Sequence, residues 1–308
     1  MKSISFLSVA LLASITGVLV SGCGWLVRSE NIGAVTAENV GAVTTKQYDF
    51  ADFNSVEVGG AFTADISRAD TYGVEITSTE NVIKYVRVVK NGNTLKIGLE
   101  GLHLSFGSTV LEARITMPEL VGLDMSGSTK GTVKGFTSAK DLRARVSGAS
   151  SLDLDGESGK FACDISGSSS VNVRGKSTAA DITLSGASSI TVDMETGSFA
   201  CVSSGSSRAT GALTATSTTI RLDGASDARL VGSGGNVKIT CSGSSDAALN
   251  GFSCGDADVD LSGSSHADMD VTGVLSVSLS GGSVLTYGGN PRLGDRIDIA
   301  GGSRLERR

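Results

Sequence analysis

The segment SGASSLDL at residues 147–154 returns as SGSSSVNV at 166–173 and as SGASSITV at 185–192. Each copy begins with a Ser-Gly-small-Ser turn and continues with alternating apolar and polar residues. Further copies run toward the C-terminus, and the repeat glycines lie at positions 127, 148, 167, 186, 205, 224, 243, 263, 281 and 301. A period of about 19 residues is typical of a solenoid, in which each repeat forms one rung and stacks on the next.

The alternation predicts that each repeat buries one face of a strand. The residues four and two positions before each glycine are apolar with one exception, Ser203, so we expect them to stack inside the solenoid. The same parity places the glycine, and the serine two positions after it, on the inward side. These serines are predicted to form a ladder of hydrogen bonds from rung to rung, and its members are Ser150, Ser169, Ser188, Ser207, Ser226, Ser245 and Ser265. A buried hydroxyl without a partner costs about 1–3 kcal/mol, so this column is interpreted as structural and not as a row of nucleophiles.

The region before the repeats also contains short alternating segments, but it lacks the 19-residue period. The pattern predicts strands at residues 55–58, 61–66, 74–77, 82–89, 95–99 and 111–116. Asn91-Gly92-Asn93 predicts a turn between two of them. We therefore expect an all-β protein, with a parallel β-helix of regular repeats over residues 122–308 after an irregular strand-rich region over residues 48–121.

The first residues have the features of a lipoprotein signal peptide. Lys2 supplies a positive start, residues 4–20 are apolar, and Val20-Ser21-Gly22-Cys23 resembles a bacterial lipobox. This resemblance implies a signal peptide at residues 1–22 and a lipid on Cys23, whose acyl chains would contribute about 0.8 kcal/mol per buried methylene to membrane anchoring. The alternative is a simple secretion signal with an incidental cysteine. Residues 23–47 are small, polar and unpatterned, which predicts a flexible tether.

The net charge indicates which classes of partner to expect, and the residue after Cys23 indicates the membrane in which the protein is anchored. The formal net charge is −6, and removal of Lys2 with the signal would lower it by one. An acidic chain with scattered Lys and Arg argues against nucleic acid as a partner. Gly24, instead of an aspartate, follows Cys23, and this favours the outer membrane of the cell envelope without specifying the leaflet.

The other four cysteines are expected to be free and to act as small apolar residues. Cys163 and Cys201 occupy the same repeat position two rungs apart, which separates them by about 9.5 Å and exceeds the reach of a disulfide. Cys241 falls at an apolar repeat position, and Cys254 is assigned to the linker between two copies. No pair has the spacing of zinc ligands, and we expect neither a metal site nor a cofactor.

Six charged residues form a candidate surface patch, and they are Arg208, Asp227, Arg229, Asp246, His266 and Asp268. On consecutive rungs, such carboxylates and an imidazole would suit a cation or a polar sugar, whereas the alternative is an ordinary solvated strand face. The acidic runs at 153–157 and 256–260 do not by themselves supply the six to eight oxygens that calcium takes from several directions. His103 is alone between predicted strands, and we expect a surface or half-buried histidine there.

Two further motifs carry a resemblance to a known family. The phrase ITMPEL at residues 115–120 leads into LDMSGS at 123–128 and then into the repeated Ser-Gly-Ser-Ser turns. Together with the lipobox, this pattern resembles the head GIN domain family, which is labelled an auto-transporter adhesin and is common in lipoproteins of Bacteroidetes. The similarity extends from about Tyr48 to the C-terminus and is looser in the last copies. It implies a right-handed β-helix and supplies no catalytic residues.

Two classes of function remain. The first is a non-catalytic lipoprotein of the cell envelope, anchored to the membrane through Cys23, whose rigid solenoid presents polar faces for adhesion or for binding a glycan or an envelope protein. The second is a carbohydrate-active β-helix enzyme, a polysaccharide lyase or hydrolase, which would need long loops around a cleft, paired carboxylates and aromatic sugar platforms. The near-uniform turns, and the position of the single tryptophan, Trp25, in the tether, favour the first class. We therefore expect no enzymatic activity.

Overall fold

The computed structural model describes residues 42–100 and 109–308. The predicted signal peptide at residues 1–22, Cys23, the tether up to residue 41 and His103 lie outside these described residues. Within the described part, no helix has the length and apolar character needed to cross a membrane. Regular structure there consists of β-strands and one short helix, α1 (Glu80–Ile83). The predicted all-β class is confirmed.

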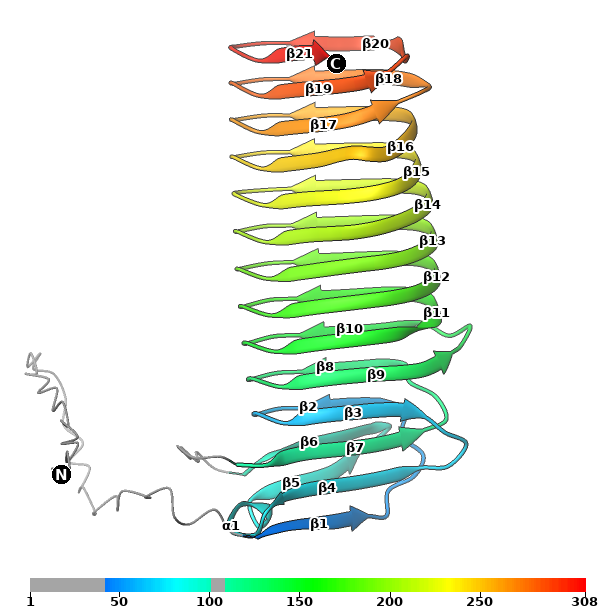
Figure 1. The fold of residues 1–308 in the computed structure, drawn as a ribbon, viewed down its shortest axis with the longest axis vertical. Helices are drawn as coiled ribbons and strands as arrows, with labels where there is room; N and C mark the ends of the chain where they lie inside the picture. The colour runs from blue at the N-terminus through cyan, green and yellow to red at the C-terminus, as the bar shows by residue number, and fades with distance from the viewer. Residues whose placement is uncertain (1–41, 101–108) are drawn as a thin grey trace, which may run out of the picture. The chain divides into compact units, whose positions relative to one another are not determined.

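The repeats form a parallel β-solenoid, as predicted. Long strands pair in register with equivalent residues 19 or 20 positions later. These strands are β11 (Ser151–Ile165), β12 (Ser170–Leu184), β13 (Ser189–Ser203), β14 (Arg208–Leu222), β15 (Asp227–Cys241) and β16 (Asp246–Leu261). Each bends around one edge of the stack, so that its two halves lie on opposite faces (Figure 1).

The stack has two faces, A and B, and two edges (Figure 1). Face A is formed by the strand segments that follow each Ser-Gly-small-Ser turn, and face B by the segments that precede the next turn. The serine edge is the edge formed by these turns, and the bend edge is the opposite one. Each rung therefore has two flat sides and two edges, and equivalent residues of successive rungs form columns.

Shorter strands complete the rungs before and after the long ones. On the C-terminal side they are β17 (His266–Val271), β18 (Val274–Leu279), β19 (Val284–Gly289), β20 (Arg292–Ile299) and β21 (Arg304–Arg307). Before β11 they are β8 (Gly122–Met125), β9 (Lys130–Thr137) and β10 (Leu142–Val146). The first repeat is longer than the others, and residues 138–141 form a loop at the bend edge between β9 and β10.

The N-terminal strands join the same stack, but not in chain order. A rung made of β2 (Ser55–Val58) and β3 (Thr63–Arg68) lies between the β8–β9 rung and the rung made of β6 (Thr94–Leu99) and β7 (Leu111–Met117). β4 (Gly73–Thr79) pairs antiparallel with β7 and with β1 (Val43–Tyr48), and β5 (Val86–Asn91) forms a hairpin with β6. After β3 the chain therefore forms β4 to β7 on the N-terminal side of the β2–β3 rung, and it then passes this rung to form β8 and β9 on the other side.

Two predictions for this region need correction, and one is confirmed. The tether predicted for residues 23–47 is wrong at its C-terminal end, because residues 43–47 belong to β1 and pair with β4. The strand predicted at 82–89 is wrong at its start, because α1 occupies residues 80–83 and β5 begins only at Val86. The turn at Asn91-Gly92-Asn93 is confirmed, since Asn91 pairs with Thr94 in the β5–β6 hairpin.

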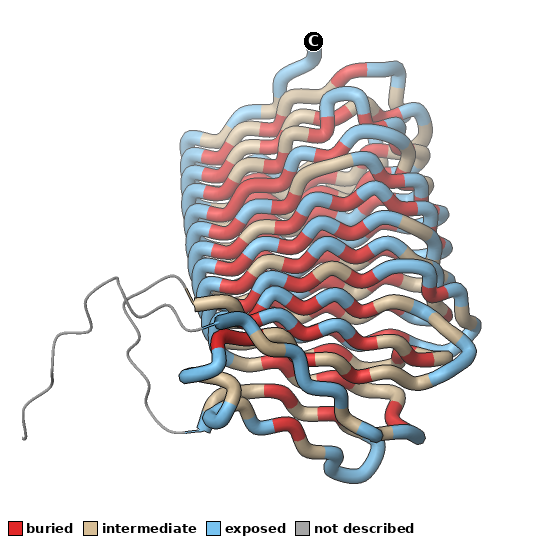
Figure 2. The backbone as a smooth tube through the Cα atoms, turned by 60° about the horizontal axis from the view of Figure 1, so that its bottom comes forward, coloured by how far each residue is buried: buried red, intermediate tan, exposed pale blue. Residues whose placement is uncertain are grey.

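Apolar residues fill the space between faces A and B. Along every rung, buried and exposed residues alternate (Figure 2). The column four positions before each glycine is buried from Leu123 to Val277, and Ile297 of the last rung is partly buried. Ser203, the one polar member of the second column, is also buried, and its hydroxyl has no hydrogen-bond partner. The predicted inward columns are confirmed except in the last rung, where Ile299 is 47% exposed because no further rung covers it.

The inward position predicted for the repeat glycines is wrong. These glycines are exposed at the serine edge, and their φ angles lie between 69° and 81°. At Gly205, for example, an added Cβ would lie 2.6 Å from the carbonyl oxygen of Gly186, the equivalent glycine of the preceding rung. Glycine is therefore needed for a left-handed backbone and for close stacking of the turns, not for a narrow interior.

Candidate functional site

The serine hydroxyls of the repeats are buried behind the turns. In the later rungs, each hydroxyl donates to the carbonyl oxygen three residues earlier in its own turn, at 2.7 Å for Ser226 and 2.9 Å for Ser265. Contacts to the preceding rung also occur, but they are longer, as at 3.3 Å from Ser245 Oγ to the Leu222 carbonyl. The predicted serine ladder therefore consists mainly of hydrogen bonds within each turn, and the hydrogen bonds between rungs are longer. Ser150, Ser169, Ser188, Ser207, Ser226, Ser245 and Ser265 are at most 2% exposed.

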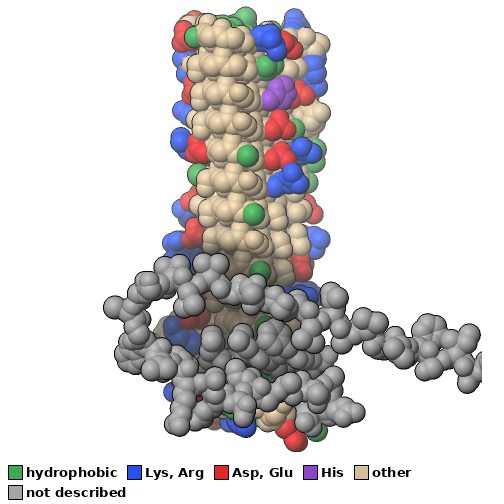
Figure 3. Space-filling model, turned by 90° about the vertical axis from the view of Figure 1, so that its left-hand side faces the viewer, with side chains coloured by type: hydrophobic (Ala, Val, Ile, Leu, Met, Phe, Trp, Pro, Cys, Tyr) green, Lys and Arg blue, Asp and Glu red, His purple; other side chains and the backbone are tan. Residues whose placement is uncertain are grey.

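The serine edge itself carries almost no charge. Figure 3 looks onto this edge and shows an uncharged column of turns between two rows of charged side chains. Backbone N–H groups of each turn donate to the turn before it, for example from Ser206 to Gly186 and from Ser244 to Gly224. The backbone polar groups of the turns are thereby satisfied within the stack.

The six residues of the candidate surface patch are brought together on face A. Register pairing aligns Arg208, Asp227, Asp246 and His266 on consecutive strands β14 to β17. Arg229 and Asp268 lie on the same strands two residues further along, facing the same side. We call these six residues the charged column.

Most of the charge in this column is compensated internally. Asp227 is only 9% exposed, and its carboxylate accepts hydrogen bonds from Arg208 Nε at 2.9 Å and Arg229 Nε at 3.2 Å. Asp268 forms an ion pair with Arg308 at 3.1 Å. Two guanidinium groups on one carboxylate fix its orientation. The column therefore offers arginine donors and an imidazole to a partner, but no free pair of carboxylates.

A second charged column lies on face B, and the N-terminal rungs extend it. Arg145 lies between Asp124 and Asp164 in the register, as the sequence predicted. Asp164 is bound mainly by Arg143, at 2.6 Å, whereas Arg145 Nε is 3.8 Å away. On its other side Asp124 faces Glu57. Partial burial, and then the Glu57 carboxylate, raise the pKa of Asp124 above its usual value.

The acidic runs that the sequence singled out have partners in the protein. Arg296, from β20, binds the carboxylates of both Asp258 and Asp260. Asp256 Oδ1 accepts the backbone N–H of Val274 at 2.7 Å. In the other run, Asp153 accepts a hydrogen bond from Asn172 Nδ2 at 2.7 Å. Among the described residues, no group of His, Cys, Asp and Glu has the arrangement of a metal site.

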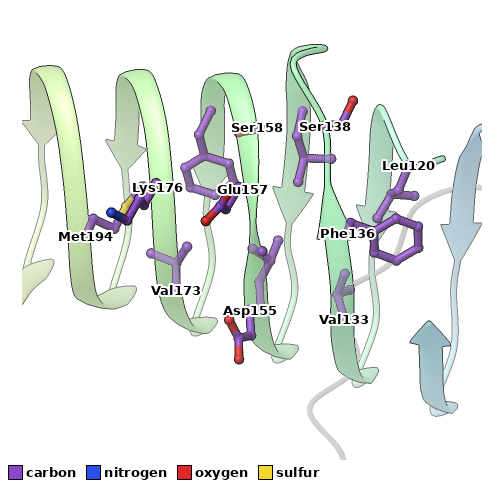
Figure 4. Close-up of a pocket in the computed structure, with 14 residues that line it drawn as sticks. Leu120, Val133, Phe136, Ser138, Asp155, Glu157, Ser158, Val173, Lys176 and Met194 are labelled. Carbon is purple, nitrogen blue, oxygen red and sulfur yellow. The ribbon is translucent and has the colours of Figure 1, made fainter. Parts of the chain in front are cut away.

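A small apolar cavity lies between the faces at the bend edge, near the long first repeat. Its volume is about 20 Å³, which is room for about one water molecule. Figure 4 shows residues that line it, among them the apolar Leu120, Val133, Phe136 and Val173 and the charged Glu157 and Lys176. The pairing of β9 with β11 shifts register between Asp155 and Gly156, so that Phe136 lies opposite Gly156. We interpret the cavity as a packing defect caused by the extra residues of this repeat.

The cysteines of the described chain are free and buried. Desolvation raises the pKa of Cys163, Cys201, Cys241 and Cys254 to about 12. The linker position predicted for Cys254 is wrong, because Cys254 lies inside β16 and is fully buried. Such thiols remain protonated at neutral pH and lack the thiolate that nucleophilic chemistry requires.

Comparison with known proteins agrees with this architecture. The family model described as "Putative auto-transporter adhesin, head GIN domain" matches residues 52–194 and 182–291. The fold is similar to that of a "putative adhesin" from Parabacteroides merdae, with a TM-score of 0.55 and 17% identity over 87% of this chain and 97% of that chain. For a "putative adhesin" from Parabacteroides distasonis, the TM-score is 0.50 and the identity 20%, over 87% of this chain and 98% of that one. No curated protein matches the sequence.

Proposed function

The chain belongs to the head GIN domain family, and from this premise we propose that it is a non-catalytic adhesion module of the cell envelope. The solenoid is its rigid part, and the outward polar columns of faces A and B are the surfaces offered to a partner. A glycan or an envelope protein is the proposed partner. The net charge of −6 disfavours nucleic acid in this role.

The observation that carries this proposal is the fixed register of charged side chains on successive rungs. Lys176 of one rung binds Glu195 of the next at 2.7 Å, and Lys160 binds Asp181 at 2.5 Å. Exposed pairs of this kind contribute little to stability. They do hold polar groups at a regular spacing of about 4.8 Å along the stack. A polymeric ligand that meets many such groups gains avidity without any single strong site.

Anchoring through Cys23 completes the proposal. The lipobox-like segment at residues 20–23 supports cleavage before Cys23 and its lipidation, and Gly24 supports the outer membrane as destination. Residues 24–41 would then space the solenoid from the bilayer. A lipid-anchored rod of this kind is suited to hold a partner close to the cell surface.

An assay that separates binding from turnover tests this function. The purified protein is incubated with immobilised envelope polysaccharides and with isolated envelope proteins, and both retention and new reducing ends are measured. We expect retention of at least one partner with every polysaccharide intact. The Leu184→Asp variant, in which the stack is disrupted, serves as control and should retain none. New reducing ends would contradict the non-catalytic assignment, and failure to retain any partner would contradict adhesion.

A further inference from the structure

The last rung of the stack is uncovered on one side. Its strands are β20 on face B and β21 on face A, and they lie at the end of the stack opposite β1 (Figure 1). Within residues 42–100 and 109–308, β20 pairs only with β18, and β21 pairs only with β19. Each of the two strands therefore presents one open row of backbone N–H and C=O groups, and such an edge is a template for pairing with another strand.

The apolar interior is also open at this end. Ile299 is 47% exposed, whereas Leu279, its equivalent on the preceding rung, is 1% exposed. Four apolar side chains of the last rung are exposed or only partly buried, and they are Leu293, Ile297, Ile299 and Leu305. A surface with the same cross-section as a rung would bury them.

Two arginines link the last rung to the rung two before it, one on each face. On face B, Arg296 of β20 reaches past β18 and binds the carboxylates of Asp258 and Asp260 on β16. On face A, Arg308 reaches past β19 and binds Asp270 on β17 at 2.9 Å. These links restrain the open edge in one conformation, which lowers the entropic cost of binding a partner.

The opposite end of the stack does not match this surface. Val82 and Ile83 of α1 pack against the core there, and the edge strands β1 and β5 carry Lys46, Arg87 and Lys90 but no acidic residue. The last rung is itself rich in arginine, with four in β20 and β21. Stacking of the last rung on the first rung of another copy would therefore oppose cations to cations. Pairing of two last rungs avoids this contact and closes after two copies.

Two last rungs can meet through a two-fold axis that runs along the strands. This axis aligns the serine edges of the two copies and lays face A of one copy over face B of the other. β21 of one copy then runs antiparallel to β20 of the second, because the strands of the two faces run in opposite directions along a rung. Antiparallel strands can continue the ladder at both open edges.

The residues of β20 and β21 are complementary in this arrangement. Counting outward from the turn at residues 300–302 gives the pairs, with the β21 residue first, as Arg304–Asp298, Leu305–Ile297 and Glu306–Arg296. The two outer pairs join opposite charges, and the middle pair joins two inward apolar side chains. Two-fold symmetry produces each pair twice, so the register matches in charge and in burial at all six positions.

The size of the end surface predicts a weak contact. A rung with sides of about seven residues and sheets about 10 Å apart measures roughly 23 Å by roughly 20 Å with its side chains, so that two copies together would bury roughly 900 Å². Stable interfaces of standard size bury about 1,200–2,000 Å². Many weak contacts acting together suit adhesion between two surfaces.

We propose that the last rung binds the last rung of a second copy, in a tail-to-tail dimer with aligned serine edges. The inference rests on the proposed adhesion function and names a second copy of this chain, anchored on a facing membrane, as an envelope partner. Cys23, the proposed anchor, precedes β1, and β1 lies at the end of the stack away from the last rung (Figure 1). Tail-to-tail pairing therefore directs the two anchored ends away from each other.

Sedimentation equilibrium of the Cys23→Ala protein, at concentrations up to about 1 mM, tests the dimer without association through lipid. We expect a monomer–dimer equilibrium and no larger species. Ile299→Asp should weaken dimerisation by at least about tenfold. Arg87→Glu, on the edge strand β5 at the other end, should leave it unchanged. Protein that remains monomeric at about 1 mM, or that assembles beyond the dimer, overturns the proposal.

Exchange of one charge pair tests the register. Arg304→Glu and Asp298→Arg should each weaken dimerisation by about tenfold, and the double variant should restore it to within about threefold. Both side chains are exposed, so the melting temperature should stay unchanged. Residues 298 and 304 of one copy lie on opposite faces, so only contact between copies can produce the rescue. A double variant that dimerises no better than the single variants overturns the register.

Single spin labels measure the arrangement of the two copies. From the turn that contains Ser264 to its equivalent in the second copy there are five strand spacings, and from that of Ser206 there are eleven. At about 4.8 Å per spacing, dipolar spectroscopy of Ser264→Cys and Ser206→Cys proteins should give about 24 Å and about 53 Å between copies. Absence of dipolar coupling, or a shorter distance for Ser206, overturns the tail-to-tail arrangement.

Vesicles test the link to adhesion. Protein coupled through Cys23 to maleimide-bearing vesicles should cluster them, whereas the Ile299→Asp protein should not, since the other thiols of the described chain are buried. Dimerisation without clustering overturns the pairing of facing membranes. If the protein does not dimerise but still retains a glycan or another envelope protein, the adhesion function stands, and loss of retention as well overturns both.

Discussion

Glu57 and Asp124 occupy the same outward position on adjacent parallel strands, so two carboxylates face each other on neighbouring rungs of face B. The chain places them 67 residues apart, and only the return of the chain beside the β2–β3 rung brings them together. Lys96, on the other side of Glu57, binds the Glu57 carboxylate, and Arg145 flanks Asp124. Despite these cations, the pKa of Asp124 is raised, mainly by partial burial and then by Glu57.

We predict that Asp124→Asn stabilises the protein at neutral pH. Like charges directly opposite each other on adjacent strands cost about 0.2–1 kcal/mol, and the substitution should raise the free energy of unfolding by that amount. Because the folded pKa lies above the unfolded value, the contribution of Asp124 is favourable below the unfolded pKa and is lost as pH rises through the folded pKa. The advantage of the variant should therefore shrink toward zero as pH falls to the ordinary value of 3.8. Urea unfolding of both proteins across this pH range measures the difference in their free energies of unfolding, and the exposed Asp193→Asn substitution is the control. A difference that grows as pH falls would contradict the raised pKa of Asp124.

The sequence predicts the repeats well because their pattern is local. Period-two alternation identifies the inward columns, and a period of 19 places Arg208, Asp227, Asp246 and His266 side by side. The parity argument fails at the repeat glycines because the turn backbone leaves the extended conformation there, so alternation cannot be counted through it. The β2–β3 rung and the Glu57–Asp124 contact are not predicted, because register between segments far apart in the chain leaves no periodic signal. The same holds for Arg296 and Arg308, whose carboxylate partners lie on strands distant in sequence.

Leu184→Asp should unfold the middle of the solenoid. Leu184 is fully buried between the faces, and an unpaired carboxylate in that position costs more than the few kcal/mol that typical destabilising substitutions remove. Limited proteolysis should then cut within β12 or β13. The matched control is Thr183→Asp, one residue earlier, where the side chain is exposed and resistance to protease should be retained. Unchanged melting of the Leu184→Asp protein would contradict the inward position of this column.

Gly205→Ala should destabilise the stack at the serine edge. The φ angle of Gly205 is 78°, a conformation that costs an L-residue roughly 1–2 kcal/mol. The added methyl group would also approach the Gly186 carbonyl to 2.6 Å and separate two turns. Ser206→Ala at the next, exposed position provides the control and should change the free energy of unfolding by less than about 0.5 kcal/mol. Equal effects of the two substitutions, measured by chemical denaturation, would be inconsistent with the close stacking of the turns.

Cys23→Ala should release the protein from the membrane fraction. If Cys23 carries acyl chains, its replacement removes all of the anchoring energy that the buried methylenes supply. Fractionation in detergent-free buffer measures the distribution, and Cys163→Ala, a buried position in the solenoid, should leave it unchanged. Continued sedimentation of the Cys23→Ala protein with membranes would show that lipidation is not the anchor.

Successive rungs stack in register, and this stacking fixes the position of every outward side chain along the axis of the solenoid. Spin labels on cysteines introduced at the exposed turn positions Ser128, Ser206 and Ser264 test it most directly, since the native thiols of the solenoid are buried. At about 4.8 Å per rung, dipolar spectroscopy should give separations of about 19 Å for 128–206 and about 34 Å for 128–264, allowing for the label arms. Broad distributions, or separations that do not increase with the number of rungs between the labels, would contradict the stacked solenoid and the surfaces built on it.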